Sequence, residues 1–269
     1  GQFLSHVSPA CGTTLMTFQT ATKPFDDPRV RKALSLAVNR DEIISTLFSK
    51  NYPKATSILS SAAIGYVPQT DKLEYNPEKA KALLDEAGFK VGADGVREKD
   101  GQKLVLTSYA SLPQPQSQAV LQLIAQQWGK IGVTLNVLAG DAGTKIVDEL
   151  DPLKTPVAVA MVGRADPDVV KSQYYPTLRN VLLQKGGTSD KVQTFADEKL
   201  NAILDEIASQ PDREKRLKAV GEAQAYVLDQ AYAVPIFEEP QAFAGAPYVK
   251  GVAFEAVGRP SFYSTWLDK

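Results

Sequence analysis

The chain has 269 residues, of which 43% are hydrophobic and 23% charged, with 30 basic and 31 acidic side chains. This composition is typical of a globular protein with an apolar core, and the balanced charge gives no reason to expect nucleic acid or an anionic membrane as a partner. One cysteine, Cys11, excludes an internal disulfide, and one cysteine with one histidine, His6, nearly excludes a structural zinc site.

The N-terminal stretch GQFLSHVSPACG has neither a basic segment nor an apolar segment, so it is not expected to be a signal peptide. It also lacks an initiator methionine, which indicates a mature, trimmed or partial chain. No apolar run approaches the roughly 20 residues that span a bilayer. We expect His6 and Cys11, near this end, to have no functional role.

A strand is expected over residues 13–20, which are rich in threonine. A helix should follow from Asp27 and Pro28, because aspartate is a good N-cap and proline is favoured at the first helical position. Its stretch RVRKAL has cations on one face, which indicates a solvated helix surface and not a nucleic-acid site. A second helix is expected from Asp41, and breakers make residues 51–74 irregular.

A third helix should begin at Asn76 and Pro77 and end at Gly88, which suits the C-cap. Two Asp-Gly pairs follow in ADGVREKDG, and such pairs are a strong signal for hairpin turns. They lead into a strand expected over residues 103–109.

Strands and helices continue to alternate without a simple repeat, and residues 171–195 are expected to be loop-like. The remaining expected elements are helices over about 115–131, 197–209 and 212–230, a short helix in TKIVDEL, and strands over 132–139 and 156–163 and in AVPIF and YVKGVAF. This order indicates an α/β or mixed α+β fold in which helices cover a sheet.

The stretch GRADPDVV (163–170) follows a buried-looking run, VAVAMV, and so places charges at the exit of a strand. Asp166 either caps a turn or helix that begins at Pro167, or it binds a cationic group of a ligand. Arg164 either binds an anionic group or is solvated or paired with Asp168.

Tyr174 and Tyr175 follow this stretch, and they are either walls of a ligand cleft or ordinary packing residues. Signatures of common enzymes are missing: there is no G-x-S-x-G, no P-loop and no G-x-G-x-x-G. The acids Asp166 and Asp168, two residues apart in a proline turn, are too common a pattern to indicate a glycosidase.

Four stretches together resemble the family 5 extracellular solute-binding proteins, the peptide- and nickel-type receptors of ABC importers. They are PFDDPRVRKALSLAVNRDEII (24–44), LEYNPEKAKALLDEAGF (73–89), IAQQWGKIGVTLNV (124–137), and the helix pair with its return strand (197–237). They occur in the order found in the family and cover nearly the whole chain.

The resemblance implies a two-lobed clamshell that traps a solute and presents it to a membrane permease. This chain would supply a periplasmic-binding-protein type II-like lobe with a central mixed sheet flanked by helices. It divides into an N-terminal tail (1–12), the second lobe (13–235) and a return segment to the first lobe (236–269). A periplasmic, or extracellular and membrane-associated, location is implied, with a signal sequence upstream.

The resemblance also implies that Asp166 is the acid that pairs with the amino terminus of a peptide ligand, with Gly163, Arg164, Tyr174 and Tyr175 beside it. The aromatic residue that the family commonly has before this motif is not present, so a peptide, an opine-like conjugate, a sugar derivative and a metal chelate all stay open. No catalytic residue, metal site or cofactor is expected. The alternatives are a hydrolase that uses acidic residues and a sensory module outside transport.

The return segment carries four aromatic residues that would lack their usual cover in this chain: Phe254, Phe262, Tyr263 and Trp266. Since burial of a large aromatic side chain contributes roughly 1.5–3 kcal/mol, they are expected to pack on the second lobe or on another copy of the chain, giving a dimer.

Overall fold

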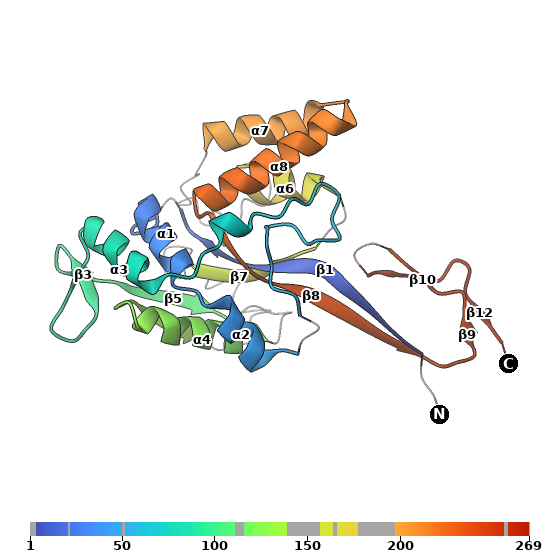
Figure 1. Cartoon of the computed structure of the whole chain (residues 1–269), viewed down its shortest axis with the longest axis horizontal. Helices are drawn as coiled ribbons and strands as arrows, with labels where there is room; N and C mark the ends of the chain where they lie inside the picture. The colour runs from blue at the N-terminus through green and yellow to red at the C-terminus, as the bar shows by residue number, and fades with distance from the viewer. Residues whose placement is uncertain are drawn as a thin grey trace, which may run out of the picture.

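The computed structural model describes most of the chain as one sheet with helices on both faces and a long ribbon leading away from it (Figure 1). The residues described are 4–20, 22–49, 52–110, 116–138, 157–163, 166–176, 197–255 and 258–268. The expected short helix in TKIVDEL lies outside them.

The sheet has five strands in the spatial order β6-β5-β7-β1-β8. Their bounds are β1 Leu4–Phe18, β5 Val105–Tyr109, β6 Thr134–Leu138, β7 Val157–Val162 and β8 Ala233–Gly245. Strand β5 runs parallel to β6 and β7, whereas β1 runs antiparallel to β7 and β8. The expectation of a mixed sheet is therefore confirmed, and β5, β6, β7 and β8 all point in one direction.

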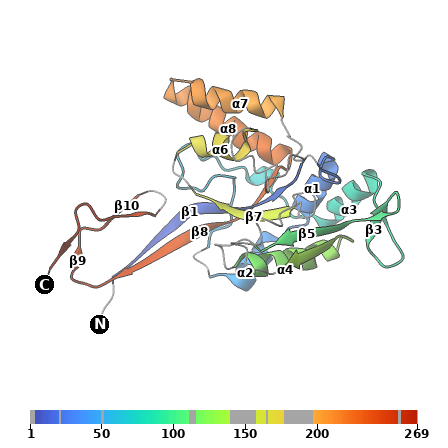
Figure 2. The ribbon, with the colours of Figure 1, turned by 180° about the vertical axis from the view of Figure 1, so that it is seen from behind.

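The helices lie in two groups on opposite faces of this sheet (Figures 1 and 2). Their bounds are α1 Pro28–Leu36, α2 Arg40–Leu47, α3 Pro77–Glu86, α4 Ser117–Gly129, α6 Asp168–Tyr174, α7 Glu198–Ser209 and α8 Arg213–Asp229, with a 3-10 turn at Thr70–Lys72. Because successive side chains of a strand point to opposite faces, Met16 packs with α1 to α4 and its neighbour Leu15 packs with α6 to α8.

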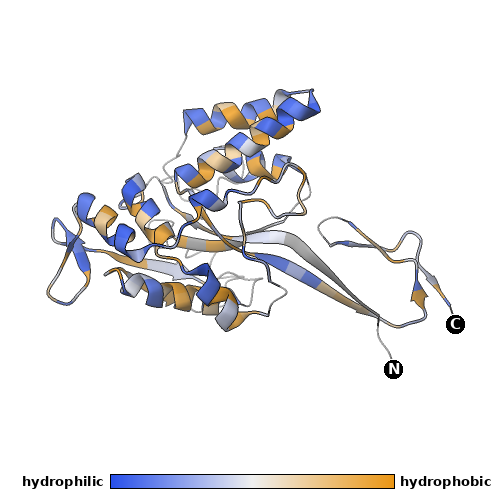
Figure 3. Cartoon of the chain, viewed as in Figure 1, coloured by the Kyte–Doolittle hydropathy of each residue, from blue (hydrophilic) through white to orange (hydrophobic). Residues whose placement is uncertain are grey.

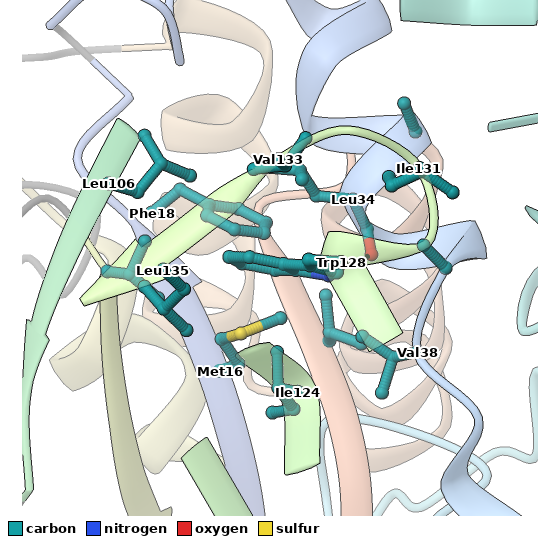
Figure 4. Close-up of a cluster of buried hydrophobic side chains, with 14 of the residues drawn as sticks. Met16, Phe18, Leu34, Val38, Leu106, Ile124, Trp128, Ile131, Val133 and Leu135 are labelled. Carbon is teal, nitrogen blue, oxygen red and sulfur yellow. Dashed lines mark hydrogen bonds between the residues drawn. The ribbon is translucent and has the colours of Figure 1, made fainter. Parts of the chain in front are cut away.

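The first core centres on Trp128 of α4, which is fully buried (Figure 4). Its ring lies 6.4 Å from that of Phe18 in β1, and its indole Nε1 donates to the carbonyl oxygen of Leu34 at 3.1 Å. That carbonyl belongs to the last turn of α1, where the amide of Val38 bonds to Ser35 instead. The tryptophan thus fills the core and also satisfies a helix-end carbonyl.

The second core lies between β1 and the three helices α6 to α8, whose buried apolar residues pack together. Figure 3 colours the hydrophobic positions of these helices orange and the hydrophilic ones blue. Gln224 of α8 is buried here and holds the loop before the 3-10 turn at Thr70–Lys72. Its Oε1 accepts from the hydroxyl of Ser57 at 2.7 Å and the amide of Val67 at 3.2 Å, and its Nε2 donates to the carbonyl of Gly65 at 2.7 Å. The loop also buries Ile58, Leu59 and Ala63 in this core, so polar and apolar contacts together fix it to α8.

The helix starts expected from the sequence are confirmed at α1 and α3. The Asp27 carboxylate accepts from the amide of Arg29, and the Asn76 side chain accepts from the amide of Lys79 at 2.9 Å. Both helices have proline at the first position, where its missing amide hydrogen is not needed.

The two Asp-Gly pairs form the turns of a three-stranded antiparallel hairpin, as expected. Its strands are β2 Lys90–Val91, β3 Arg97–Lys99 and β4 Gln102–Lys103. Asp100 and Gly101 have φ of 53° and 76°, the left-handed conformation that both central residues of a type I′ turn require.

Several expected element bounds differ from the structure, and two of the differences concern the edge of the lobe. Strand β1 begins at Leu4, inside the stretch expected as a tail, because it pairs with β8 as far as Gly245. Helix α6 occupies the start of the stretch expected to be loop-like. Val169, Val170 and Tyr174 give this helix a buried face, although it is only seven residues long.

The C-terminal segment follows β8 away from the lobe and forms only two-residue strands (Figure 2). These are β9 Val249–Lys250, β10 Ala253–Phe254, β11 Pro260–Ser261 and β12 Trp266–Leu267. Phe254 lies against Phe243 of β8, with 5.0 Å between ring centres. Phe262, Tyr263 and Trp266 are 64%, 99% and 54% exposed, so packing on the lobe, the first of the two expected alternatives, is wrong for these three, and packing on another copy stays a prediction.

Candidate functional site

The exit of β7 lies at the edge of the sheet where β8 also leaves the lobe. The last residue of β7, Val162, pairs with Thr13 of β1, and Thr13 pairs on its other side with Glu238 of β8. Gly163 follows and is partly exposed, and the Asp166–Pro167 turn then leads into α6. Ligands of open α/β sheets bind beyond the carboxyl ends of strands, which makes this edge the candidate site.

Asp166 is exposed, and its carboxylate also has protein partners. Its Oδ1 accepts from the backbone amide of Asp168 at 2.8 Å, which closes the turn. Arg216 of α8 lies 2.9 Å from the carboxylate of Asp168 and 3.6 Å from that of Asp166. The turn-capping interpretation therefore has direct geometric support, while the ligand role of Asp166 stays a prediction.

The two tyrosines have different environments. Tyr174 is 3% exposed in the second core, where burial raises the pKa of its hydroxyl, and that hydroxyl has no hydrogen-bond partner among the described residues. Tyr175 is partly exposed and donates to Asp205 of α7 at 3.2 Å. The ammonium of Lys171 lies 4.4 Å from the Tyr175 ring centre and 2.7 Å from Asp205.

The exit of β7 thus brings Gly163 and Asp166 to one edge, and it places Tyr174 in the core behind and Tyr175 against α7. Arg164 lies outside the described residues. The ligand roles of all five residues stay predictions.

Two acids that the sequence analysis did not select lie at the same edge, at the end of the buried part of β8. Glu238 is 2% exposed, and its two oxygens accept from the amide and hydroxyl of Ser61 at 3.1 and 2.7 Å. Burial raises the pKa of Glu238, although the hydrogen bonds from Ser61 oppose that shift. The signal was available: two acids follow the buried run AVPIF, as Asp166 follows VAVAMV.

Glu239, the second of these acids, points to the other face of the sheet. Its Oε1 accepts from the hydroxyl of Thr14 at 2.6 Å and from the side-chain amide of Gln116, just before α4, at 3.2 Å. Thr14 is itself 2% exposed. The carboxylate is therefore held by donors from two elements, one of them buried.

The described residues contain no group of three or more His, Cys, Asp or Glu side chains arranged to hold a metal ion. Of the helices that these residues form, none combines the length and the apolar character that crossing a membrane requires.

Comparison with known proteins gives one consistent result. Residues 3–180 match the family described as bacterial extracellular solute-binding proteins, family 5, middle region. The chain is 25% identical to the dipeptide-binding protein of Escherichia coli K12 over 265 residues, which cover 97% of this chain and 46% of the relative. It is 29% identical to heme-binding protein A of Haemophilus influenzae over 254 residues, covering 94% and 44%.

Solved structures of similar fold give the same picture. The oligopeptide-binding protein AppA of Bacillus subtilis, in complex with a nonapeptide, superposes with a TM-score of 0.79 at 20% identity, covering 99% of this chain and 53% of that one. NikA of Brucella suis, in complex with Fe(III)-EDTA, has a TM-score of 0.74 at 22% identity, with coverage of 95% and 51%. The chain spans about half the length of the curated relatives it matches.

Proposed function

Because the chain belongs to the bacterial extracellular solute-binding proteins of family 5, we propose that it is part of the substrate-binding component of an ABC importer. The family match over residues 3–180 carries this proposal. It is supported by relatives that are named for binding a dipeptide and heme. The solute is proposed to be a peptide or a related small molecule.

The proposed mechanism is capture by closure. Solute contacts that form only when two lobes close shift the open–closed equilibrium towards the closed form, and a membrane permease recognises that form. The protein releases the solute unchanged, so it is not an enzyme in this proposal. A periplasmic location, or an extracellular one at the membrane, follows from the same function.

Residues 13–235 are proposed to form the second lobe, and residues 236–269 to return to a first lobe. The exposed aromatic side chains of the return segment support this, because Phe262, Tyr263 and Trp266 leave apolar area without cover in this chain. A first lobe would cover that area. Without one, the same side chains would pair two copies of the chain.

The solute site is proposed at the exit of β7, formed by Gly163, Arg164, Asp166, Tyr174 and Tyr175. The location of Gly163 and Asp166 beyond the carboxyl end of a strand supports this assignment. Tyr174 would form the inner wall of this site, behind the exposed residues, since its ring is packed in the core.

The test is to purify the complete polypeptide that contains this chain under gentle conditions and to record its native mass spectrum. The proposal predicts a bound small molecule that is recovered with unchanged mass after prolonged incubation. A bound molecule that is cleaved during incubation would instead favour the acidic-residue hydrolase. If no small molecule is bound, and none binds from a broad metabolite and peptide collection, the proposal is wrong.

A further inference from the structure

We propose that the loop of residues 61–68, called the edge loop below, is a surface on which the remainder of the complete polypeptide docks when the two lobes close. This inference rests on the proposed function and adds the contact residues, Ile64 and Val67. It comes from the way the loop is anchored, from its exposed apolar side chains and from its place beside β8.

The edge loop is fixed to the sheet at its first residue. The amide and hydroxyl of Ser61 donate to the two carboxylate oxygens of Glu238, at 3.1 and 2.7 Å. Glu238 is the last buried residue of β8. Beyond it, β8 continues along the ribbon that leads away from the lobe (Figures 1 and 2). The edge loop thus begins where the chain leaves the lobe.

The other end of the edge loop is fixed to α8. Buried Gln224 accepts from the amide of Val67 at 3.2 Å and donates to the carbonyl of Gly65 at 2.7 Å. Gly65 has a φ of 82°, and a Cβ atom there would lie 2.9 Å from Cγ1 of Val220. Glycine is the residue that permits both this backbone conformation and this close approach. The backbone is therefore held at both ends.

Two apolar side chains of this anchored loop are nonetheless exposed. Ile64 is 47% exposed and Val67 is 38% exposed, whereas Ala63 beside them is buried. Both exposed side chains are β-branched, so they have little χ1 freedom to lose. A surface whose backbone and side chains are already ordered loses little conformational entropy on binding. These features are typical of a contact surface.

The size of this surface indicates a partner that is tethered to it. Two partly exposed side chains offer far less than the roughly 1,200–2,000 Å² that a stable complex between separate proteins buries. A tethered partner needs a smaller contact, because linkage supplies an effective concentration in the millimolar range.

The place of the edge loop indicates which partner this is. The chain spans 46% of the length of the dipeptide-binding relative, and β8 leaves the lobe beside the loop. The remainder of the complete polypeptide, the proposed first lobe, is therefore both tethered and nearby.

This contact would act on closure without touching the solute. Apolar area that is covered only in the closed form stabilises that form, whatever solute is bound. Ile64 and Val67 would thus set how long the closed form lasts, whereas residues at the exit of β7 set which solute it holds.

The first experiment locates what the edge loop touches in the complete polypeptide as purified. A photoreactive benzophenone amino acid replaces Ile64, and in a control it replaces Val91, which is 60% exposed on β2 of the hairpin. After illumination, cross-linked peptides are identified by mass spectrometry. We expect position 64 to cross-link, within a protein of monomer mass, to a segment outside residues 1–269. Position 91 should not form this cross-link.

A second measurement tests the effect on closure. The double variant Ile64→Thr and Val67→Thr keeps both side chains β-branched but removes apolar area, and Val91→Thr is the matched control. Release of the co-purified small molecule on dilution is followed by native mass spectrometry. The double variant should release it about 4- to 16-fold faster than the wild type, about fourfold for each methylene-sized loss of buried area. Val91→Thr should keep the wild-type rate.

Other results overturn the inference. It is wrong if position 64 cross-links only within residues 1–269 or only to a second copy. It is also wrong if no cross-link forms, as expected for a surface kept for the permease, or if the double variant releases the small molecule at the wild-type rate. The cross-link decides the inference even when no small molecule is bound, whereas the absence of that molecule counts against the proposed function alone.

Discussion

Replacing Trp128 with phenylalanine tests whether the first core depends on one side chain for both packing and helix capping. The substitution removes Nε1 and leaves the carbonyl of Leu34 without its donor. An unsatisfied buried acceptor costs about 1–3 kcal/mol. The smaller ring in a fully buried site costs about 1–2 kcal/mol more. The expected loss is therefore about 2–5 kcal/mol of unfolding free energy.

The assay is urea unfolding followed by far-ultraviolet circular dichroism, with the slope of the free energy against urea compared between variants. Tyr263→Phe is the matched control, because the Tyr263 side chain is 99% exposed and its hydroxyl contributes little to the fold. The control should stay within about 0.5 kcal/mol of the wild type. A loss below about 1 kcal/mol for Trp128→Phe, at an unchanged slope, would refute the reasoning.

Three further predictions concern other parts of the lobe. Gln224→Leu should lower the free energy of unfolding by about 2–4 kcal/mol, because the buried partners of Gln224 lose their hydrogen bonds. It should also speed hydrogen exchange at the amide of Val67, and an unchanged exchange rate there would contradict this. Burial raises the pKa of Glu238 above its ordinary 4.5, so its protonated form favours the fold. Its stabilising contribution is complete below the ordinary pKa and is lost as the pH rises through the raised value. The difference in melting temperature, Glu238→Gln minus wild type, should therefore become more positive between pH 4.5 and pH 7. A difference that stays constant over this range would contradict the prediction. Asp27→Ala should lower the free energy of unfolding, measured in urea, by about 0.5–2 kcal/mol, because α1 loses its N-cap. Asp26→Ala is the control, because the neighbouring Asp26 is not the N-cap of α1.

The parts of the fold that could be predicted from sequence are those fixed by local chemistry. The Asp-Pro and Asn-Pro starts of α1 and α3 and the Asp-Gly turn at Asp100 depend on residues close together in the chain. The mixed sheet followed from the family resemblance and from the alternation of elements. In both cases the information lies within short segments or in their order.

The rest depends on contacts between distant segments. Strand β1 extends back to Leu4 only because β8, more than 200 residues later, pairs with it. Helix α6 is too short to be stable alone and forms because its apolar face packs against α7 and α8. The sequence does place Glu239 directly after a buried strand, but the way its carboxylate is held could not be predicted, since Thr14 and Gln116 reach it from elsewhere in the chain.

The most direct test of the account is a crystal structure of the complete polypeptide with its co-purified solute. We expect the solute to lie at the carboxyl end of β7, within contact distance of Gly163 and Asp166, and a second lobe to cover it. A solute bound elsewhere on the chain, away from the edge where β7 and β8 leave the sheet, would contradict the account.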